Sequence, residues 1–267
     1  MKQEDTLKIL TEAYFSDNPH EREVIERLHE IIGSTGVFVD IGASLGQYSR
    51  KISQIIDNGF IIAIEPDPIR FRELEKNCKE WEIGSTNQIE ALHSVISDVD
   101  GEINFYSTGS NVSGGLFSRD LNYLPVKSRE GIKWKEIQVK TFRLDTLFKG
   151  VFKELKPDLI KIDVEGSELR VLMGCENILR EGTSLFLIEV HNWADPKGQK
   201  NPSEIFSRMK SFGYGKINFS GRYLFTKNPI RKYPYLWLKG ILFSMKNFLK
   251  RVFNKLLRIA QLSPIYL

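Results

Sequence analysis

Short apolar segments and helical patterns alternate along most of the chain. Five segments rich in Val, Ile and Leu have the pattern of strands buried on both faces of a parallel sheet: 37–41, 60–65, 89–95, 158–163 and 184–190. Helical patterns follow four of these segments, at 47–56, 68–81, 167–180 and 202–212. The alternation predicts a doubly wound α/β fold, in which a mostly parallel sheet carries helices on both faces.

Both ends of the chain depart from this alternation. Two more strands, 214–219 and 222–227, are joined through Ser220-Gly221, which predicts an antiparallel last strand and a sheet of seven strands. Two helical patterns, 4–15 and 20–32, precede the first strand. We therefore expect three parts: an N-terminal helical cap (1–35), a central domain (36–228) and a C-terminal tail (229–267).

The stretch from 98 to 140 is less regular. Asp100-Gly101 between Val99 and the apolar run 103–106 predicts a β-hairpin. A strand at 136–140 and a short helix at 142–148 follow. Residues 107–132 are rich in Ser, Gly and Asn and are too many for an ordinary connection, so they are expected to form a lid or substrate loop. A surface insert without a function is the alternative.

The first strand ends in a motif that suggests a ligand site. Asp40 is followed by Gly42 and Gly46, the pattern D-x-G-x-x-x-G. A dinucleotide site would have G-x-G-x-x-G, which presents helix N–H groups to a pyrophosphate. An acid at the strand end instead repels phosphate and attracts a cation, such as an ammonium or a sulfonium group. Ligands of open α/β sheets bind beyond the carboxyl ends of the strands, which is where this turn lies.

The second strand also ends in an acid, Glu65. A carboxylate at this position can accept hydrogen bonds from two ribose hydroxyls. S-adenosylmethionine has an amino acid end, a sulfonium and a ribose but no phosphate. It therefore has a cationic group for the acid at the first strand end and ribose hydroxyls for the acid at the second.

Several motifs resemble those of the FkbM family of class I S-adenosylmethionine-dependent methyltransferases. They are VDIGASLGQYS (39–49), AIEPDP (63–68), TFRLDTL (141–147), LIKIDVEGSELRVL (159–172) and LIEVH (187–191). The resemblance covers roughly residues 36–227. It implies a Rossmann-like fold, S-adenosylmethionine as cofactor, and O-methylation of a hydroxyl on a sugar, a glycan or a related natural product.

The resemblance also implies a set of cofactor-binding residues at the first two strand ends: Asp40, Gly42, Ala43, Gly46, Glu65, Pro66 and Asp67. A group in the loop after the third strand should meet the adenine. The candidates there are His93, Ser94, Ser97 and Asp98, with Ser97 and Asp98 preferred.

Three residues at the ends of later strands are candidates for catalysis. Asp163 and Glu165 follow the fourth strand and alternate along the chain, so both could face the cleft and position the acceptor or remove its proton. A helix N-terminal charge is the alternative for Glu165. His191 ends the fifth strand and has the residue type best suited as a base near neutral pH. Asp163, Glu165, Glu189 and His191 could also bind Mg²⁺ or Mn²⁺. Because they lack a compact metal-ligand spacing, we expect no essential metal.

The charge of the chain is unevenly distributed. The net charge is +4, yet residues 205–267 contain thirteen Lys and Arg and no acid. Apolar residues recur at helical spacing along 233–261, with Lys246, Lys250 and Arg258 on the opposite face. This basic amphipathic pattern favours peripheral contact with an anionic membrane. Packing of the helix on the domain or on a second subunit is the alternative.

The remaining features define the expected compartment and the competing functions. Two cysteines and a polar N-terminus predict a cytoplasmic protein, peripheral on the cell membrane through its tail. A nucleic-acid methyltransferase would use the basic tail as an electrostatic footprint. We expect no nucleic-acid partner, because KIDVEG replaces the N/D-P-P-Y/F motif of base methylation. A nicotinamide reductase would need its Tyr-x-x-x-Lys motif on a suitable helix, and none of the matches to this motif in the sequence has one. A scaffold without catalysis would not need the intact Asp40 and Glu65 motifs.

Overall fold

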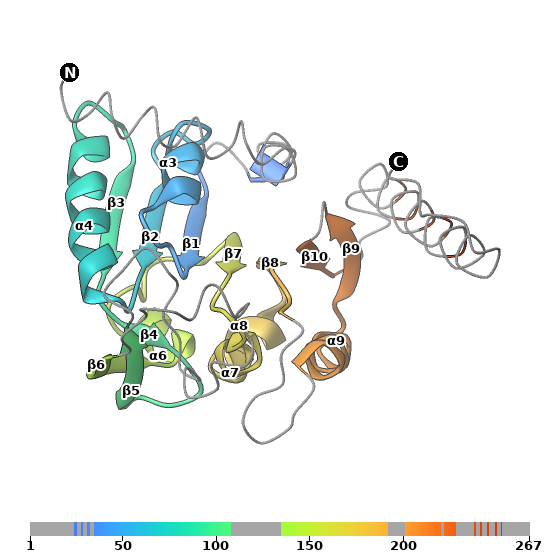
Figure 1. Cartoon of the computed structure of the whole chain (residues 1–267). Helices are drawn as coiled ribbons and strands as arrows, with labels where there is room; N and C mark the ends of the chain where they lie inside the picture. Colours follow the sequence, from blue (N-terminus) through green and yellow to red (C-terminus); the bar gives the residue numbers. More distant parts are fainter. Residues whose placement is uncertain are drawn as a thin grey trace, which may run out of the picture.

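The computed structural model describes most of the central domain. The described residues are 24–25, 28, 31–32, 35–107, 135–191, 201–219, 222–227 and single positions in the tail at 238, 241, 245, 249 and 252. The main sheet contains β1 (Val37–Ile41), β2 (Phe60–Ile64), β3 (Gln88–Leu92), β7 (Leu159–Ile162), β8 (Leu185–Ile188), β9 (Gly215–Phe219) and β10 (Arg222–Thr226) (Figure 1).

The strands of this sheet follow the order β3-β2-β1-β7-β8-β10-β9. The first five are parallel, and β10 pairs antiparallel with both β8 and β9. The expected mostly parallel, seven-stranded sheet with an antiparallel last strand is therefore confirmed. The chain reverses its direction of travel across the sheet between β1 and β7, which is the place where open α/β sheets bind ligands.

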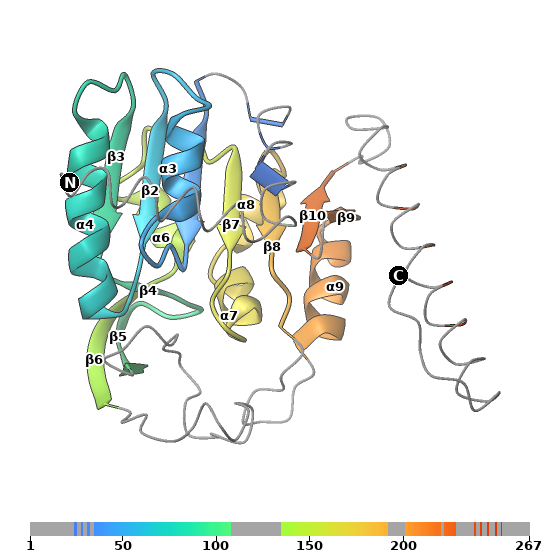
Figure 2. The ribbon, with the colours of Figure 1, turned by 45° about the horizontal axis from the view of Figure 1, so that its top comes forward.

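Helices cover both faces of the sheet, as Figures 1 and 2 show. Successive residues of a strand point to opposite faces. Phe38 of β1 and Ile61 of β2 accordingly pack in the cluster that includes residues of α3 (Gln47–Ser53) and α4 (Pro68–Glu82). Val39 and Ile62 pack in the opposite cluster, with four other helices: α6 (Leu144–Lys149), α7 (Glu168–Met173), α8 (Glu176–Glu181) and α9 (Asn201–Ser211).

The expected hairpin at Asp100-Gly101 is wrong. β4 (Val95–Ile96) and β5 (Gly101–Ser107) belong to a second sheet of three strands, in the order β4-β6-β5. β6 (Lys135–Phe142) lies between them, parallel to β4 and antiparallel to β5. β4 and β5 therefore each pair with β6, which comes later in the sequence, and not with each other. Val95 consequently belongs to this second sheet, and the third strand of the main sheet ends at Leu92.

The single helix expected over 167–180 is also wrong, because the segment forms α7 and α8. The break coincides with Gly174, where an added Cβ would lie 2.0 Å from the carbonyl oxygen of Ser97. The carboxylate of Asp145 then accepts hydrogen bonds from the backbone N–H groups of Asn177 and Ile178 in the first turn of α8. Close backbone contact thus interrupts one helix, and a distant acid caps the next.

Several expected segments lie outside the described residues. They are the helix 4–15, most of the helix 20–32, nearly all of the loop 107–132 and most of the tail 229–267. Val24, Ile25 and Leu28 of the second helix are described; they are helical and pack in the same cluster as α3 and α4. Within the described residues, no helix has both the length and the apolar character that crossing a membrane requires.

Gly42 allows a close approach between the loops after β1 and β7. Its φ is +79°, and an added Cβ would lie 1.9 Å from the carbonyl oxygen of Asp163. We predict that Gly42→Ala lowers the free energy of unfolding by about 2–5 kcal/mol, from left-handed strain plus overpacking. Urea unfolding followed by circular dichroism measures the loss.

Gly84→Ala is the matched control for this substitution. Gly84 has a similar φ of +75°, but nothing lies within 4 Å of an added Cβ. Its cost should be limited to the backbone strain, about 1–2 kcal/mol. Equal losses in the two variants would show that the contact with Asp163 does not constrain position 42.

Candidate functional site

A cavity of about 340 Å³ opens at the carboxyl ends of the parallel strands. Its volume is in the range of small-molecule sites. The turn after β1, the end of β2 and the segment after β3 contribute one group of lining residues, among them Gly42, Glu65 and Ser94. The segments after β7 and β8 contribute a second group, among them Asp163, Glu165 and His191. We call these groups the glycine-turn wall and the carboxylate wall.

The glycine-turn wall is held together by backbone hydrogen bonds. The N–H groups of Gly42 and Ala43 both donate to the carbonyl oxygen of Ile64, each at 3.0 Å. Ser44 has a left-handed φ of 55°, and its N–H donates to Oε2 of Glu65 at 2.9 Å. The N–H of Asp67 donates to Oε1 of Glu65, also at 2.9 Å. These contacts fix the position of the Glu65 carboxylate at the strand end.

Burial makes the charged form of Glu65 costly. Its side chain is almost fully buried, and this raises the pKa to about 7 even though the N–H groups of Asp67 and Ser44 stabilise the ionised form. Each carboxylate oxygen can accept more than one hydrogen bond. Glu65 can therefore accept further hydrogen bonds from a ligand in the cavity.

Asp40 lies beneath the cavity and forms an ion pair there. Its carboxylate is 1% exposed and accepts a hydrogen bond from Ser49 Oγ at 2.8 Å. Lys161 of β7 donates to its other oxygen at 3.2 Å. Sequence reasoning missed Lys161, although a lone lysine within an apolar strand is a signal of a buried ion partner. Asp40 thus acts on the cavity through Lys161, which lines it.

Gly46 and Asp67 do not line the cavity, and both lie against α4. An added Cβ at Gly46 would lie 2.8 Å from side-chain atoms of Leu74 and Trp81, so this glycine permits α3 to pack closely on α4. Asp67 is the N-cap of α4 and accepts hydrogen bonds from the N–H groups of Ile69 and Arg70. Pro66, between the two acids, does line the cavity.

Among the four adenine candidates, only Ser94 lines the cavity. Its Oγ is buried and has no hydrogen-bond partner within the described part of the chain. Ser97 donates to Asp98 at 2.8 Å, and Asp98 lies 3.6 Å from Arg170, so this pair is directed toward α7. His93 stacks on Phe71, with 4.8 Å between the ring centroids.

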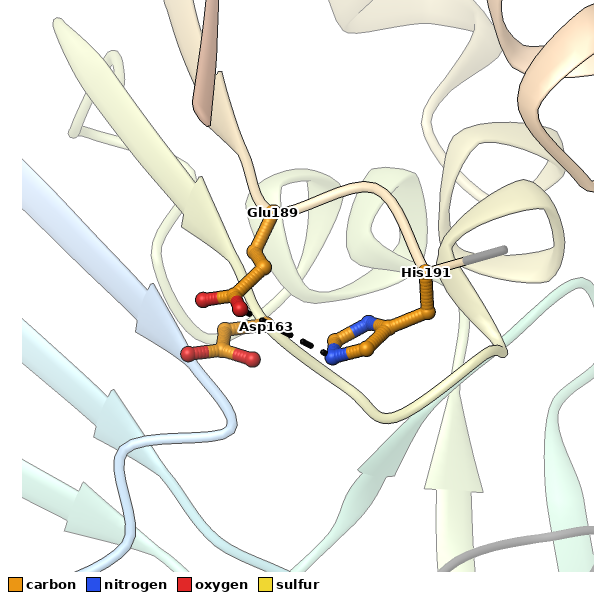
Figure 3. Close-up of side chains that lie close together, drawn as sticks. All are labelled: Asp163, Glu189 and His191. Atoms are coloured by element: carbon orange, nitrogen blue, oxygen red, sulfur yellow. Dashed lines mark ion pairs between the residues drawn. The ribbon is translucent and has the colours of Figure 1, made fainter. Parts of the chain in front are cut away.

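The carboxylate wall brings together Asp163, Glu189 and His191 (Figure 3). Nε2 of His191 lies 3.9 Å from Oε1 of Glu189 and 3.6 Å from Oε2 of Glu165. Lys161 Nζ lies 3.5 Å from Oδ2 of Asp163. Burial opposes the ionisation of Asp163, but Lys161, Arg222 and His191 outweigh this effect and lower the pKa of the carboxyl.

A buried glutamate orients His191. Glu168 is 0% exposed, and its Oε1 lies 2.7 Å from Nδ1 of His191. Burial disfavours the imidazolium, yet the hydrogen bond and the charges of Glu168, Glu165 and Asp163 raise the pKa of His191 to about 9. Glu168 escaped sequence reasoning, because an acid in the first turn of a helix is ordinary on the surface.

Glu165 and Arg222 complete this wall. Glu165 has a left-handed φ of 53°, which is unusual for a residue with a side chain and is often found at functional sites. Its side chain is 40% exposed, more than that of Asp163 or His191. Arg222 of β10 donates to Oε2 of Glu189 at 2.5 Å. Sequence reasoning missed Arg222, because its strand pairs out of sequence order.

Comparison with known proteins identifies the relatives of this chain. The hexuronic acid methyltransferase AglP of Haloferax volcanii is 28% identical over 177 residues, which are 66% of this chain and 65% of that protein. The AMB antimetabolite synthetase AmbE of Pseudomonas aeruginosa is 27% identical over 200 residues, which cover 65% of this chain and 9% of that protein. The chain thus spans less than two thirds of each of these two relatives.

A crystal structure of a methyltransferase FkbM from Methylobacillus flagellatus superposes with a TM-score of 0.47 and 15% identity, over 75% of this chain and 50% of that chain. The model of the methyltransferase FkbM domain matches residues 40–215, from the acid of the glycine turn to the start of β9. Since this match covers more than half of the sequence, the chain belongs to the FkbM methyltransferase family.

Proposed function

We propose that this chain transfers a methyl group from S-adenosylmethionine to a hydroxyl of a sugar or a sugar-containing acceptor. The observation that carries the proposal is the cavity with two chemically different walls. The glycine-turn wall offers a fixed carboxylate and close backbone, and the carboxylate wall offers several groups that bind hydroxyls. The family and the name of the relative AglP support a methyl transfer and a sugar acceptor.

The residues of the glycine-turn wall fit this cofactor. Glu65 has lone pairs for the ribose hydroxyls, and Ser94 Oγ is a buried polar atom that a ligand such as adenine can satisfy. Gly42 lines the cavity at the turn after β1, next to the space that we propose for the amino acid end of the cofactor. Bound S-adenosylmethionine would supply an electrophilic methyl group, and these residues would orient it.

Glu165 is our candidate for the group that accepts the proton of the acceptor hydroxyl. Its carboxylate lines the cavity and is the most exposed of the three candidate catalytic groups. Asp163 forms an ion pair with Lys161, and Nδ1 of His191 is hydrogen-bonded to Glu168. In this proposal Asp163 and His191 position the acceptor, while Glu165 receives its proton.

The tail adds a proposal about location. Leu238, Met245, Leu249 and Val252 are helical and 39–61% exposed. Their spacing puts them on one side of a helix. The sequence from 229 onward contains basic residues and no acid. We infer that this apolar side lies in an anionic membrane surface, which would bring the enzyme close to a lipid-linked acceptor. A cytoplasmic location, on the inner face of the membrane, is part of the same proposal.

The pH dependence of cofactor binding tests the role of Glu65. The ionised carboxylate accepts both ribose hydrogen bonds, and its pKa in the free protein is about 7. Affinity for S-adenosylhomocysteine should therefore rise with pH and level off above 7, being about tenfold lower at pH 6 than at pH 8. Calorimetric titration measures this profile.

Two variants control that experiment. Glu65→Gln should bind S-adenosylhomocysteine more weakly and without the rise through pH 7. Glu75→Gln, at a 46% exposed position on α4, should keep the profile of the unchanged protein. The same pH profile in Glu65→Gln and in the unchanged protein would contradict the assignment. NADH serves as the ligand control and should not bind.

Glu165→Gln tests the catalytic assignment. We expect the rate of methyl transfer to fall by about 10²–10⁴-fold, because the proton acceptor is lost. The affinity for S-adenosylhomocysteine should stay the same. The assay measures S-adenosylhomocysteine formation with neutral and uronic acid glycosides as acceptors, and Glu181→Gln on α8 is the control. Cofactor binding without transfer to any of these sugars would contradict the acceptor class.

Vesicle binding tests the tail. The double variant Met245→Glu, Leu249→Glu places two charges on the exposed apolar side and should release the full chain from vesicles containing phosphatidylglycerol. The matched control is Ile83→Glu, at an 82% exposed apolar position next to α4, which should bind as before. Cosedimentation measures both. Undiminished binding of the double variant, or equal binding to neutral vesicles, would refute membrane contact through this side.

A further inference from the structure

We propose that Asp163, Glu189 and His191 bind one divalent metal ion at the carboxylate wall. The site takes a cation that accepts both oxygen and nitrogen ligands, such as Mn²⁺. This inference goes beyond methyl transfer and concerns the ligand-free protein as well. It also departs from the expectation drawn from sequence spacing, in which Asp163 and Glu189 are too far apart to form a compact motif.

The fold places the three ligands together. Ile162 of β7 and Ile188 of β8 are direct neighbours in the parallel register. Asp163 and Glu189 are the residues that follow them, so both acids leave the sheet side by side. His191 lies two residues farther on and turns its ring back toward them (Figure 3). A sequence separation of this kind gives no motif, because the pairing of the strands creates the proximity.

The distances fit a single cation. One ligand atom from each residue lies within 4.8 Å of the other two. Ligands bound about 2.0–2.3 Å from a metal lie roughly 3–4.5 Å from each other. Small side-chain rotations therefore suffice to close the site. Three protein ligands also leave coordination positions for water or an acceptor oxygen, as in catalytic metal sites.

Glu168 supplies the support that a histidine ligand needs. Metal-binding histidines commonly donate their second ring N–H to a carboxylate, which fixes the tautomer and the ring orientation. Here the fully buried Glu168 lies 2.7 Å from Nδ1 of His191, and it also accepts the N–H of Gly166 at 2.9 Å. Nε2 remains on the side of Glu189 and Glu165. This contact lies outside the three ligands and independently favours a bound metal.

The charges around the site leave room for a dication. Among the residues that the structure describes at this wall, Lys161 and Arg222 carry permanent positive charge, and each is paired with carboxylates. Five carboxylates are linked to these cations or to His191: Asp40, Asp163, Glu165, Glu168 and Glu189. Arg222 contacts Oε2 of Glu189, while Oε1 is the oxygen nearest His191. A divalent ion would offset most of the remaining negative charge.

Titration of the full chain with MnCl₂ tests the site directly. After treatment with a chelator and its removal, the loss of the free Mn²⁺ electron paramagnetic resonance signal should reveal one saturable site per chain. Pulsed measurement of the bound Mn²⁺ should show coupling to an imidazole nitrogen. This spectroscopic readout uses the unchanged protein and needs neither cofactor nor acceptor, so its outcome is separate from that of methyl transfer.

Two variants test ligands, and a third tests the residue that orients His191. Glu189→Gln and His191→Gln should each weaken Mn²⁺ binding by more than tenfold. Glu168→Gln removes the carboxylate that orients His191. It should weaken Mn²⁺ binding by about 10–100-fold, which is the usual effect of mutating a residue that hydrogen-bonds to a histidine ligand. Glu154→Gln, at an 87% exposed site, should leave the affinity unchanged. Circular dichroism melting of each variant verifies that it is folded.

Three results would overturn the proposal. The first is the absence of saturable Mn²⁺ binding by the unchanged chain, and the second is bound Mn²⁺ without nitrogen coupling. Equal affinity of the unchanged protein and Glu189→Gln would remove Glu189 as a ligand and overturn the site as described.

Discussion

The buried pair of Asp40 and Lys161 is the interaction on which both walls of the cavity depend. The two residues are direct neighbours across the parallel pair of β1 and β7, at the point where the sheet order reverses. Both side chains are almost completely buried. Removing one partner of such a pair leaves an uncompensated charge and typically costs about 3–5 kcal/mol. Charge neutralisation therefore constrains both strand ends at once.

From this pair the constraint extends in two directions. On one side, Asp40 holds Ser49 of α3, and the ring of Tyr48 covers Lys161 at 4.8 Å. The helix that follows the glycine turn is thereby fixed against the sheet. On the other side, Lys161 reaches Asp163 and so connects the ion pair with the carboxylate wall. The proposed cofactor region and acceptor region share one buried cation.

The strands of the main sheet could be predicted from the sequence, whereas only some of the residues of the site could. Buried parallel strands are apolar throughout, so their positions and their acidic ends could be recognised one by one. The prediction of a hairpin at Asp100-Gly101 was wrong because β5 pairs with β6, a strand that comes later in the sequence. Lys161, Glu168 and Arg222 were missed because their meaning comes from partners that are distant in sequence. Gly46 belongs to the cofactor-binding set that the resemblance implies, but the atoms nearest to an added Cβ at this position are side chains of α4.

The charge of the carboxylate wall bears on the proposal that the cavity takes a sugar acceptor. A uronic acid carries a carboxylate of its own, and carboxylates that approach Asp163, Glu165 and Glu189 without a cation between them repel one another. Arg222 and Lys161 are already engaged with acids of this wall. A divalent ion held by Asp163, Glu189 and His191 would add positive charge at this wall and would reduce that repulsion. A neutral sugar would experience no such repulsion, so the two proposals about metal and acceptor are physically linked.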